Sequence, residues 1–343
     1  MIVHPAFTFG DEEIEGFWTA KFEASMAEEN TNTVANNNVV NKTVKIVPNV
    51  NSWRYIQEGN AFKTCLKMKE EIKYKLSKKS DTHQMKNNEW GAIAYLSASQ
   101  YGNIPTKNNS GTSQEGKYYV YIAGGDYITN INQSTTGNIT GIYDLNGGAW
   151  EYVAAYWNNK GSGLEETGTE EIFYDGKLNK EYEKYFDKYE VGDLEKEEGE
   201  KIWNMLSTEG NKKLYELANE RINLMKYIKG DAMYEAINEW SYWGRYGEVY
   251  TVNDVKYNPY EFTTWLKPII NEDGELTDTG ETKVLQYGRG LYGNDYTLIG
   301  TYIYSFIRRG GDWGDDNASG IFSSCGSYGS SGYVAGFRPT III

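Results

Sequence analysis

The most informative stretch of this chain is GIYDLNGGAWEY, residues 141–152. The two glycines in its middle permit a tight turn, because glycine adopts positive φ angles at little steric cost. Trp150 and Glu151 follow directly. We expect Trp150 to fill the centre of a largely irregular fold. We expect Glu151 to be buried with a partner, because an unpaired buried charge is costly.

Two further strings lie near the end of the chain, RRGGDW at residues 308–313 and GFRP at residues 336–339. Their arginines are suited to bind carboxylates or backbone carbonyls inside a protein. Scaffold polar groups outnumber catalytic ones in such frameworks. We therefore interpret Glu151, Arg309 and Arg338 as structural residues.

Helical spacing of apolar residues predicts two helices. The first follows a cap at residue 51 or 52, and the second covers about 80–97 with Asp81 as its cap. Their apolar faces hold Ala61, Cys65 and Met68 in the first helix, and Trp90, Ile93 and Ala94 in the second. Cys65 is therefore expected to be a small core residue rather than a nucleophile.

The charge and hydropathy of the chain exclude several partners. Its 343 residues carry 48 acidic against 34 basic side chains, which argues against nucleic acid and anionic membranes as partners. The mean hydropathy is −0.65, and no apolar run is long enough to insert into a membrane. The first residues lack the features of a signal peptide. Whether an anchoring segment lies upstream stays open.

Histidine and cysteine are too scarce for common metal sites. With only two histidines and two cysteines, the chain cannot form a three-histidine metal site or a four-cysteine zinc site. At most one disulfide can form, and whether Cys65 and Cys325 meet stays open. The 30 tyrosines and 10 tryptophans favour a binding face instead. We expect no cofactor.

Residues 159–300 differ in character from their flanks. The 40 positions 161–200 carry 14 acidic and 5 basic side chains, and an apolar stripe between Leu214 and Met225 is typical of a helix. We predict one domain, residues 1–343, with an acidic, largely helical insertion at 159–300. The acidic half is expected to be a solvated face, with a partner-docking surface as the alternative.

The three strings, together with NNEWGAIAYL at residues 87–96, resemble the formylglycine-generating enzyme family, also called sulfatase-modifying factors. The resemblance covers about residues 1–157 and 301–343. It implies an α+β protein with a variant of the C-type lectin fold, in which two helices pack around short twisted antiparallel sheets.

The catalytic ligands of that family are missing here. The two copper-binding cysteines that follow its glycine pair correspond to Asp315 and to about Gly320, and Cys325 falls on a non-catalytic position. The related iron-dependent sulfoxide synthases use three histidines. The resemblance therefore implies the fold without the oxidase chemistry, and we expect no enzymatic activity.

The segment between the glycine pair and GFRP is rich in Gly, Ser, Asp, Asn and Tyr. It corresponds to the region that C-type lectin-fold variable proteins of diversity-generating retroelements diversify. In these proteins AAY template codons change to codons for the same small set of residues. Ile321, Phe322 and Val334 fit fixed core positions. The simpler interpretation is a passive Gly/Ser loop.

We therefore predict a ligand- or receptor-binding protein displayed on a virion or cell surface, with a protein or glycan partner. The alternatives are a relative of the oxidases with displaced ligands and a purely structural surface component. A structural calcium ion at Asp315 and Asp316 stays open, as does the oligomeric state. The predicted ligand-binding residues are Trp313, Asp315, Asp316, Asn317, Ser319, Ser323, Ser324, Ser327, Tyr328, Ser330, Ser331 and Tyr333.

Overall fold

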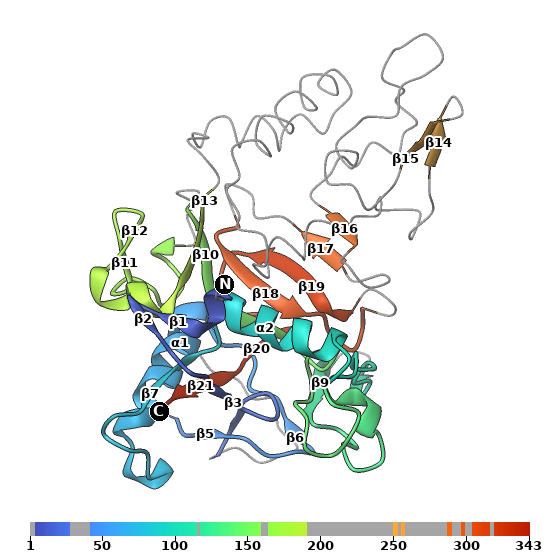
Figure 1. The fold of residues 1–343 in the computed structure, drawn as a ribbon, viewed down its shortest axis with the longest axis horizontal. Coiled ribbons are helices and arrows are strands. Elements are labelled where there is room, and N and C mark those ends of the chain that lie inside the picture. Colours follow the sequence, from blue (N-terminus) through green and yellow to red (C-terminus); the bar gives the residue numbers. More distant parts are fainter. Residues whose placement is uncertain are drawn as a thin grey trace.

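The chain folds as a mixed α+β protein (Figure 1). The computed structural model describes residues 4–27, 42–114, 117–158, 164–190, 304–315 and 319–343, with short strands at 250–252, 255–257, 287–289 and 296–298. In this part of the chain the α-helices are α1 (Glu58–Lys67) and α2 (Asn87–Ala98). No helix among these residues is long and apolar enough to cross a membrane.

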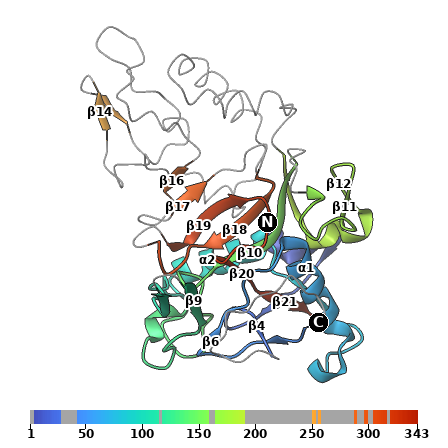
Figure 2. The same cartoon turned by 180° about the vertical axis from the view of Figure 1, so that it is seen from behind.

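The largest sheet joins the informative strings of the sequence. Strand β10 (Trp150–Asn158) pairs antiparallel with β18 (Phe306–Gly310), which pairs antiparallel with β19 (Gly320–Ser327). Strand β20 (Ala335–Phe337) runs parallel to β10. The remaining members are β13 (Asp187–Glu190), β16 (Tyr287–Arg289) and β17 (Tyr296–Leu298). Figures 1 and 2 show β10, β18 and β19 at the centre of the described molecule.

Smaller sheets surround this one. Two have three strands: β3 (Trp18–Thr19), β21 (Pro339–Ile342) and β7 (Asp81–Gln84); and β6 (Val50–Asn51), β9 (Lys117–Ala123) and β8 (Gly111–Gln114). The pairs are β1 (Thr8–Phe9) with β2 (Glu12–Glu13), β4 (Ser25–Met26) with β5 (Val44–Lys45), β11 (Phe173–Tyr174) with β12 (Lys177–Leu178), and β14 (Tyr250–Val252) with β15 (Val255–Tyr257). The 3-10 helices are η1 (Pro5–Phe7), η2 (Met68–Glu70), η3 (Ile72–Tyr74), η4 (Ile131–Gln133) and η6 (Lys180–Tyr185).

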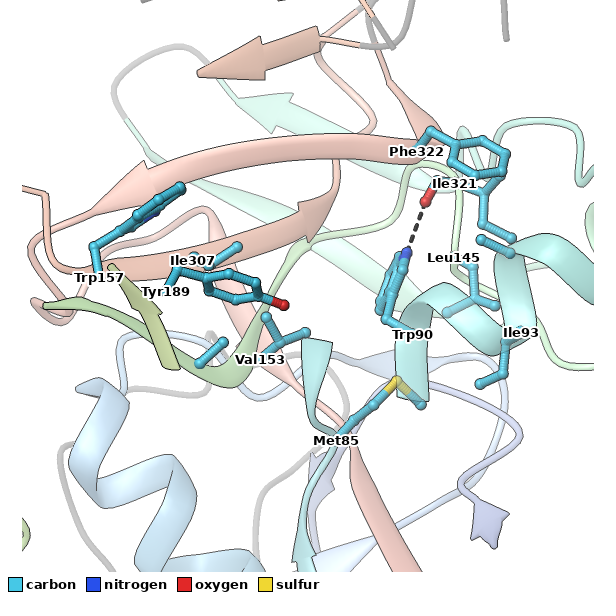
Figure 3. Packing of buried hydrophobic residues seen from close by; sticks show 12 residues of the cluster. Met85, Trp90, Ile93, Leu145, Val153, Trp157, Tyr189, Ile307, Ile321 and Phe322 are labelled. Atoms are coloured by element: carbon cyan, nitrogen blue, oxygen red, sulfur yellow. Dashed lines mark hydrogen bonds between the residues drawn. The ribbon is translucent and has the colours of Figure 1, made fainter. Parts of the chain in front are cut away.

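The hydrophobic core forms on both faces of β10, because successive side chains of a strand point to opposite faces. One face, with Val153 and Trp157, packs with Trp90 of α2. The other, with Tyr156, packs with Phe62 of α1. Figure 3 shows the Trp90 indole against β19, where its Nε1 donates a hydrogen bond to the Ile321 carbonyl over 2.6 Å.

Trp150 does not occupy the centre of the core, so that prediction is wrong. It is buried, but it belongs to a smaller cluster with Tyr152, Cys325 and Ala335. Trp90 belongs to the larger cluster described above and is fully buried. The reason is its position along the strand: Trp150 is the first residue of β10 and lies at the end of the strand rather than at its middle.

Arg338 and Glu151 form a buried ion pair with each other. The sequence indicated that each charge would be buried only with a partner or with backbone groups, but it did not pair the two. The Arg338 Nε donates to Glu151 Oε2 at 2.9 Å and its Nη2 to Oε1 at 2.5 Å. Nη1 also donates to the Ala20 carbonyl at 2.7 Å, and Nη2 to the Tyr143 carbonyl at 2.8 Å. Both side chains are buried, which fits the structural role expected of them. Arg309 is likewise buried, with its guanidinium 6.0 Å from the Trp90 ring centroid.

The two helices exist, but both begin later than predicted. Asn51 belongs to β6 and pairs with Ile122, and Asp81 is the first residue of β7. Helix α2 begins at Asn87, where the Lys86 amide donates to the Glu89 carboxylate at 2.9 Å. Polar residues at strand ends resemble helix caps in sequence, and tertiary strand pairing overrides that local preference. The predicted apolar faces are correct, since Ala61, Cys65, Met68, Trp90, Ile93 and Ala94 are all buried.

The described part of the predicted insertion belongs to the main fold. Residues 164–190 form short strands and a 3-10 helix instead of α-helices. Ile172, Phe173 and Phe186 pack into the core with Phe62. Strands β13 and β17 pair with β10 and β19, respectively. The predicted helical stripe at 214–225 lies outside the described residues.

The Arg338–Glu151 pair predicts a large and coupled stability cost. Arg338→Ala and Glu151→Ala are each expected to lower the free energy of unfolding by about 3–5 kcal/mol, because each leaves a buried charge without its partner. The double variant is expected to cost clearly less than the sum, measured by denaturant unfolding. Lys63→Ala is the control: its pair with the exposed Glu171 spans 3.6 Å, and we expect a cost below about 1 kcal/mol. Additive costs at 151 and 338 would contradict this account.

Candidate binding surface

Two glycine pairs, residues 147–148 and 310–311, lie in backbone contact next to the predicted binding segment. Gly147, with φ of 74°, donates its amide to the Gly310 carbonyl at 3.2 Å. The Trp313 amide donates to the Gly148 carbonyl at 3.0 Å. At Gly311, with φ of 74°, a Cβ would lie 2.6 Å from the Ser319 Cα. These close backbone contacts require glycine, and they fix where Asp312 and Trp313 project.

Residues 312–315 form a tight turn with two carboxylates, which we call the acidic turn. The Asp312 amide donates to Asp315 Oδ2 at 2.9 Å, and the Gly314 amide donates to Asp312 Oδ1 at 2.7 Å. The Tyr121 hydroxyl donates to Asp312 Oδ2 at 3.3 Å. The turn therefore brings two carboxylates together at the edge of the surface.

Burial raises the pKa of both carboxyl groups of the acidic turn. Burial, followed by the charge of Asp315, raises the pKa of Asp312 to about 6. Burial also raises the pKa of Asp315, while hydrogen bonds and the charges of Lys107 and Arg308 oppose it. Two carboxylates in one partly buried turn are expected to behave in this way.

Aromatic rings and one buried arginine pack next to the acidic turn. The Arg54 guanidinium lies 4.3 Å from the Tyr121 ring centroid. Tyr121 meets the half-buried Trp313 edge-on, with ring centroids 6.2 Å apart. A Cβ on Gly111 of β8 would lie 2.5 Å from Trp313 Cδ1. The indole is therefore packed against β8 and held in a defined orientation.

Residues 328–333 form a loop that the scaffold holds by its main chain, which we call the tethered loop. Four of its carbonyl oxygens accept hydrogen bonds from outside the loop. The pairs are Glu58 N to Gly329 O at 2.9 Å, Tyr152 Oη to Ser330 O at 2.8 Å, Tyr55 N to Gly332 O at 2.9 Å, and Arg54 Nη1 to Tyr333 O at 2.6 Å. The side chains of Tyr328, Ser330, Ser331 and Tyr333 are exposed. Backbone position is thus specified without these side chains.

Of the other predicted contact residues, four serines are buried and two residues lie outside the described part of the chain. Ser319, Ser323, Ser324 and Ser327 are buried. The last three belong to β19, of which every residue is buried, so this half of the segment is a strand of the main sheet rather than a loop. Asp316 and Asn317 lie outside the described residues, and with them the calcium site considered for Asp315 and Asp316. The structure therefore brings Trp313, Asp315 and the tethered loop to the surface.

The predicted fixed positions match the core. Ile321 and Phe322 are each 1 % exposed and pack in the largest cluster. Val334 packs against the cluster of Trp150 and Tyr152. The sequence reasoning missed Asp312, Tyr121 and Arg54. An aspartate three positions before Asp315 was a visible signal for a paired turn, whereas the contribution of β9 and of residue 54 depends on long-range packing.

Neither cysteine is exposed at this surface. Cys325 is buried, and burial raises the pKa of its thiol while Arg308, whose Nη2 donates to Sγ at 3.2 Å, opposes that shift. Cys65 is also buried, as predicted, and neither cysteine forms a disulfide. Within the described ranges, no group of three or more His, Cys, Asp or Glu side chains is placed to hold a metal ion.

Comparison of the sequence with protein-family models and with curated proteins gives no match.

The acidic turn predicts a carboxyl group that titrates close to neutral pH. We expect carbon-13 carboxyl NMR to show Asp312 titrating with a midpoint near 6. Asp315→Asn should lower the midpoint but leave it above the ordinary 3.8 of an aspartate, because burial remains. Since the folded state favours the protonated form, stability from this group is present below about 3.8 and is lost as pH rises through about 6. Asp312→Asn should remove both the signal and this part of the pH dependence. A midpoint at or below 3.8 contradicts the assignment.

Proposed function

We propose that this protein is a non-enzymatic recognition protein with a C-type lectin-like fold, displayed on a virion or cell surface. Its ligand is a protein or a glycan, bound through Trp313, the acidic turn and the tethered loop. Exposed tyrosines, with Tyr328 at 41 % and Tyr333 at 44 %, supply contact area. Serines and backbone groups supply adaptable hydrogen bonds.

The single observation that carries this proposal is the tethering of the loop by its carbonyls. A rigid loop loses little conformational entropy on binding, which favours affinity. Because the tethers use main-chain oxygens, side chains at 328, 330, 331 and 333 can change while the loop keeps its position. That property suits a surface whose residues are exchanged by a diversifying mechanism.

The finer fold assignment is supported by the arrangement of the sequence strings. Residues 141–152, 308–313 and 336–339 come together around β10, β18 and β20, and α1 and α2 pack on opposite faces of β10. These are the strings on which the resemblance to formylglycine-generating enzymes depends. Their shared position is consistent with a C-type lectin-like framework that lacks the metal ligands of the enzymes.

A pair of display libraries tests the proposal directly. In the first, positions 328, 330, 331 and 333 are randomised on the full chain, displayed on yeast and selected against lysozyme and streptavidin as two unrelated model ligands. We expect most members to be displayed as folded protein, and each selection to enrich distinct binders. The control library randomises Ser319, Ser323, Ser324 and Ser327, whose burial predicts loss of folded display for most members. Equal loss in both libraries, or no enriched binder from the first, contradicts the proposal.

Natural variation supplies a second test. Coding sequences from homologous loci of related strains are to be aligned over residues 310–338. We expect substitutions to concentrate at 328, 330, 331 and 333, while Gly310, Gly311, Phe337 and Arg338 stay unchanged. A near-copy of this segment that differs at adenines, beside a reverse-transcriptase gene, is expected for retroelement diversification. A tethered loop as invariant as its scaffold would favour a fixed structural role.

A further inference from the structure

A polar groove of about 710 Å³ lies beside the hairpin of β8 and β9, apart from the tethered loop. Its floor includes Val120 and Ile122, which alternate along β9 with Tyr121. Since Tyr121 contacts Trp313 and Asp312, strand alternation places the groove on the opposite face of the hairpin. The groove therefore lies on a different face from Trp313, and the two regions are linked electrostatically through Lys107, which lines the groove and acts on the acidic turn.

The lining of the groove is rich in uncharged hydrogen-bonding side chains. It holds the amides of Asn49, Asn109, Asn130 and Gln133 and the hydroxyls of Thr106, Ser110 and Thr112. Amides and hydroxyls both donate and accept hydrogen bonds. The charged lining residues are Lys107 and Asp126, which have opposite signs. The groove therefore offers many neutral polar contacts and no net charge.

The walls of the groove are held in place by hydrogen bonds within the protein. The Gln133 Nε2 donates to the Lys107 carbonyl at 3.1 Å, and the Asp126 amide donates to Asn49 Oδ1 at 3.1 Å. The Asn130 amide donates to the Asp126 carbonyl at 3.0 Å. The volume of the groove lies within the range of small-ligand sites, and its lining is more polar and more open than in most of them.

We propose that this groove binds a neutral saccharide of one or two rings. A sugar ring has an apolar C–H face that fits the floor of Val120 and Ile122, and a rim of hydroxyls that fits the amides and hydroxyls of the walls. The absence of net charge among the lining residues disfavours phosphorylated and other anionic ligands, because Asp126 offsets Lys107. The groove is open and offers few buried contacts, so we expect weak binding.

Saturation-transfer NMR on the full chain tests the proposal with named probes: glucose, galactose, mannose, N-acetylglucosamine and their common disaccharides. We expect saturation transfer to at least one sugar, together with backbone amide shifts confined to residues 106–112 and 120–133. Asn109→Leu and Asn130→Leu keep side-chain size but remove the amide. Each should weaken binding about two- to tenfold, as expected for one lost hydrogen bond.

Asn132→Leu is the matched control, because Asn132 is exposed in the adjoining 3-10 helix η4 and does not line the groove. It should leave the Kd unchanged. The proposal is overturned if none of the sugars shows transfer, if both groove variants bind as the wild type does, or if a neutral extended peptide shifts the groove amides while sugars do not. Sugar-induced shifts confined to 328–333 also overturn it, and they would assign glycan binding to the tethered loop instead. Failure of the display libraries leaves this result unaffected, so the two proposals are separable.

Discussion

Arg338 joins parts of the chain that are distant in sequence. Its guanidinium binds Glu151 of β10 and the carbonyl oxygens of Ala20 and Tyr143. Strand β10 is the member of the main sheet on which both helices pack, so the ion pair fixes the N-terminal segment, the loop before β10 and the last strand relative to the core. In a protein built from short strands, such directional contacts specify the arrangement that apolar packing alone leaves less defined.

The same buried region holds two more carboxylates, and they extend the network toward the binding surface. Glu23 accepts a hydrogen bond from the Ala149 amide at 2.7 Å. Asp144 accepts from the Gly124 amide at 2.7 Å and from Asn108 Nδ2 at 2.8 Å. Burial, with the charges of Asp144 and Glu151, raises the pKa of Glu23 well above its ordinary value. One buried arginine among three carboxylates thus favours a retained proton, and the network orients the glycine turn and the β8–β9 region together.

Sequence reasoning reached the parts of the fold that local pattern encodes. Helical spacing identified the faces of Cys65 and Trp90, and the cost of an unpaired buried charge indicated that Glu151 and Arg338 each need a buried partner. It did not reach features that depend on long-range pairing. Asp81 looks like a helix cap but begins a strand beside β21, and nothing near Ile172 and Phe173 in the sequence indicates that they pack in the core. At the candidate surface, the sequence pointed to Trp313 and to the tyrosines that the structure leaves exposed. It did not point to Tyr121 or Arg54, because nothing near them in sequence indicates the acidic turn.

Composition alone does not separate the buried from the exposed positions of the Ser/Gly/Tyr-rich segment between Gly311 and Gly336, because the same residue types occur in both. In β19, which lies between β18 and β17, the small side chains of Ser323 and Ser324 are fully buried, so larger residues there would overpack the core. A few positions later, Ser330 and Ser331 are exposed on a loop held by its carbonyls, so their identity matters little to folding. The fold thus places tolerant positions directly beside intolerant ones. Variation of this segment is therefore expected to follow burial rather than residue type, and a surface built in this way can change what it recognises while the scaffold beneath it stays the same.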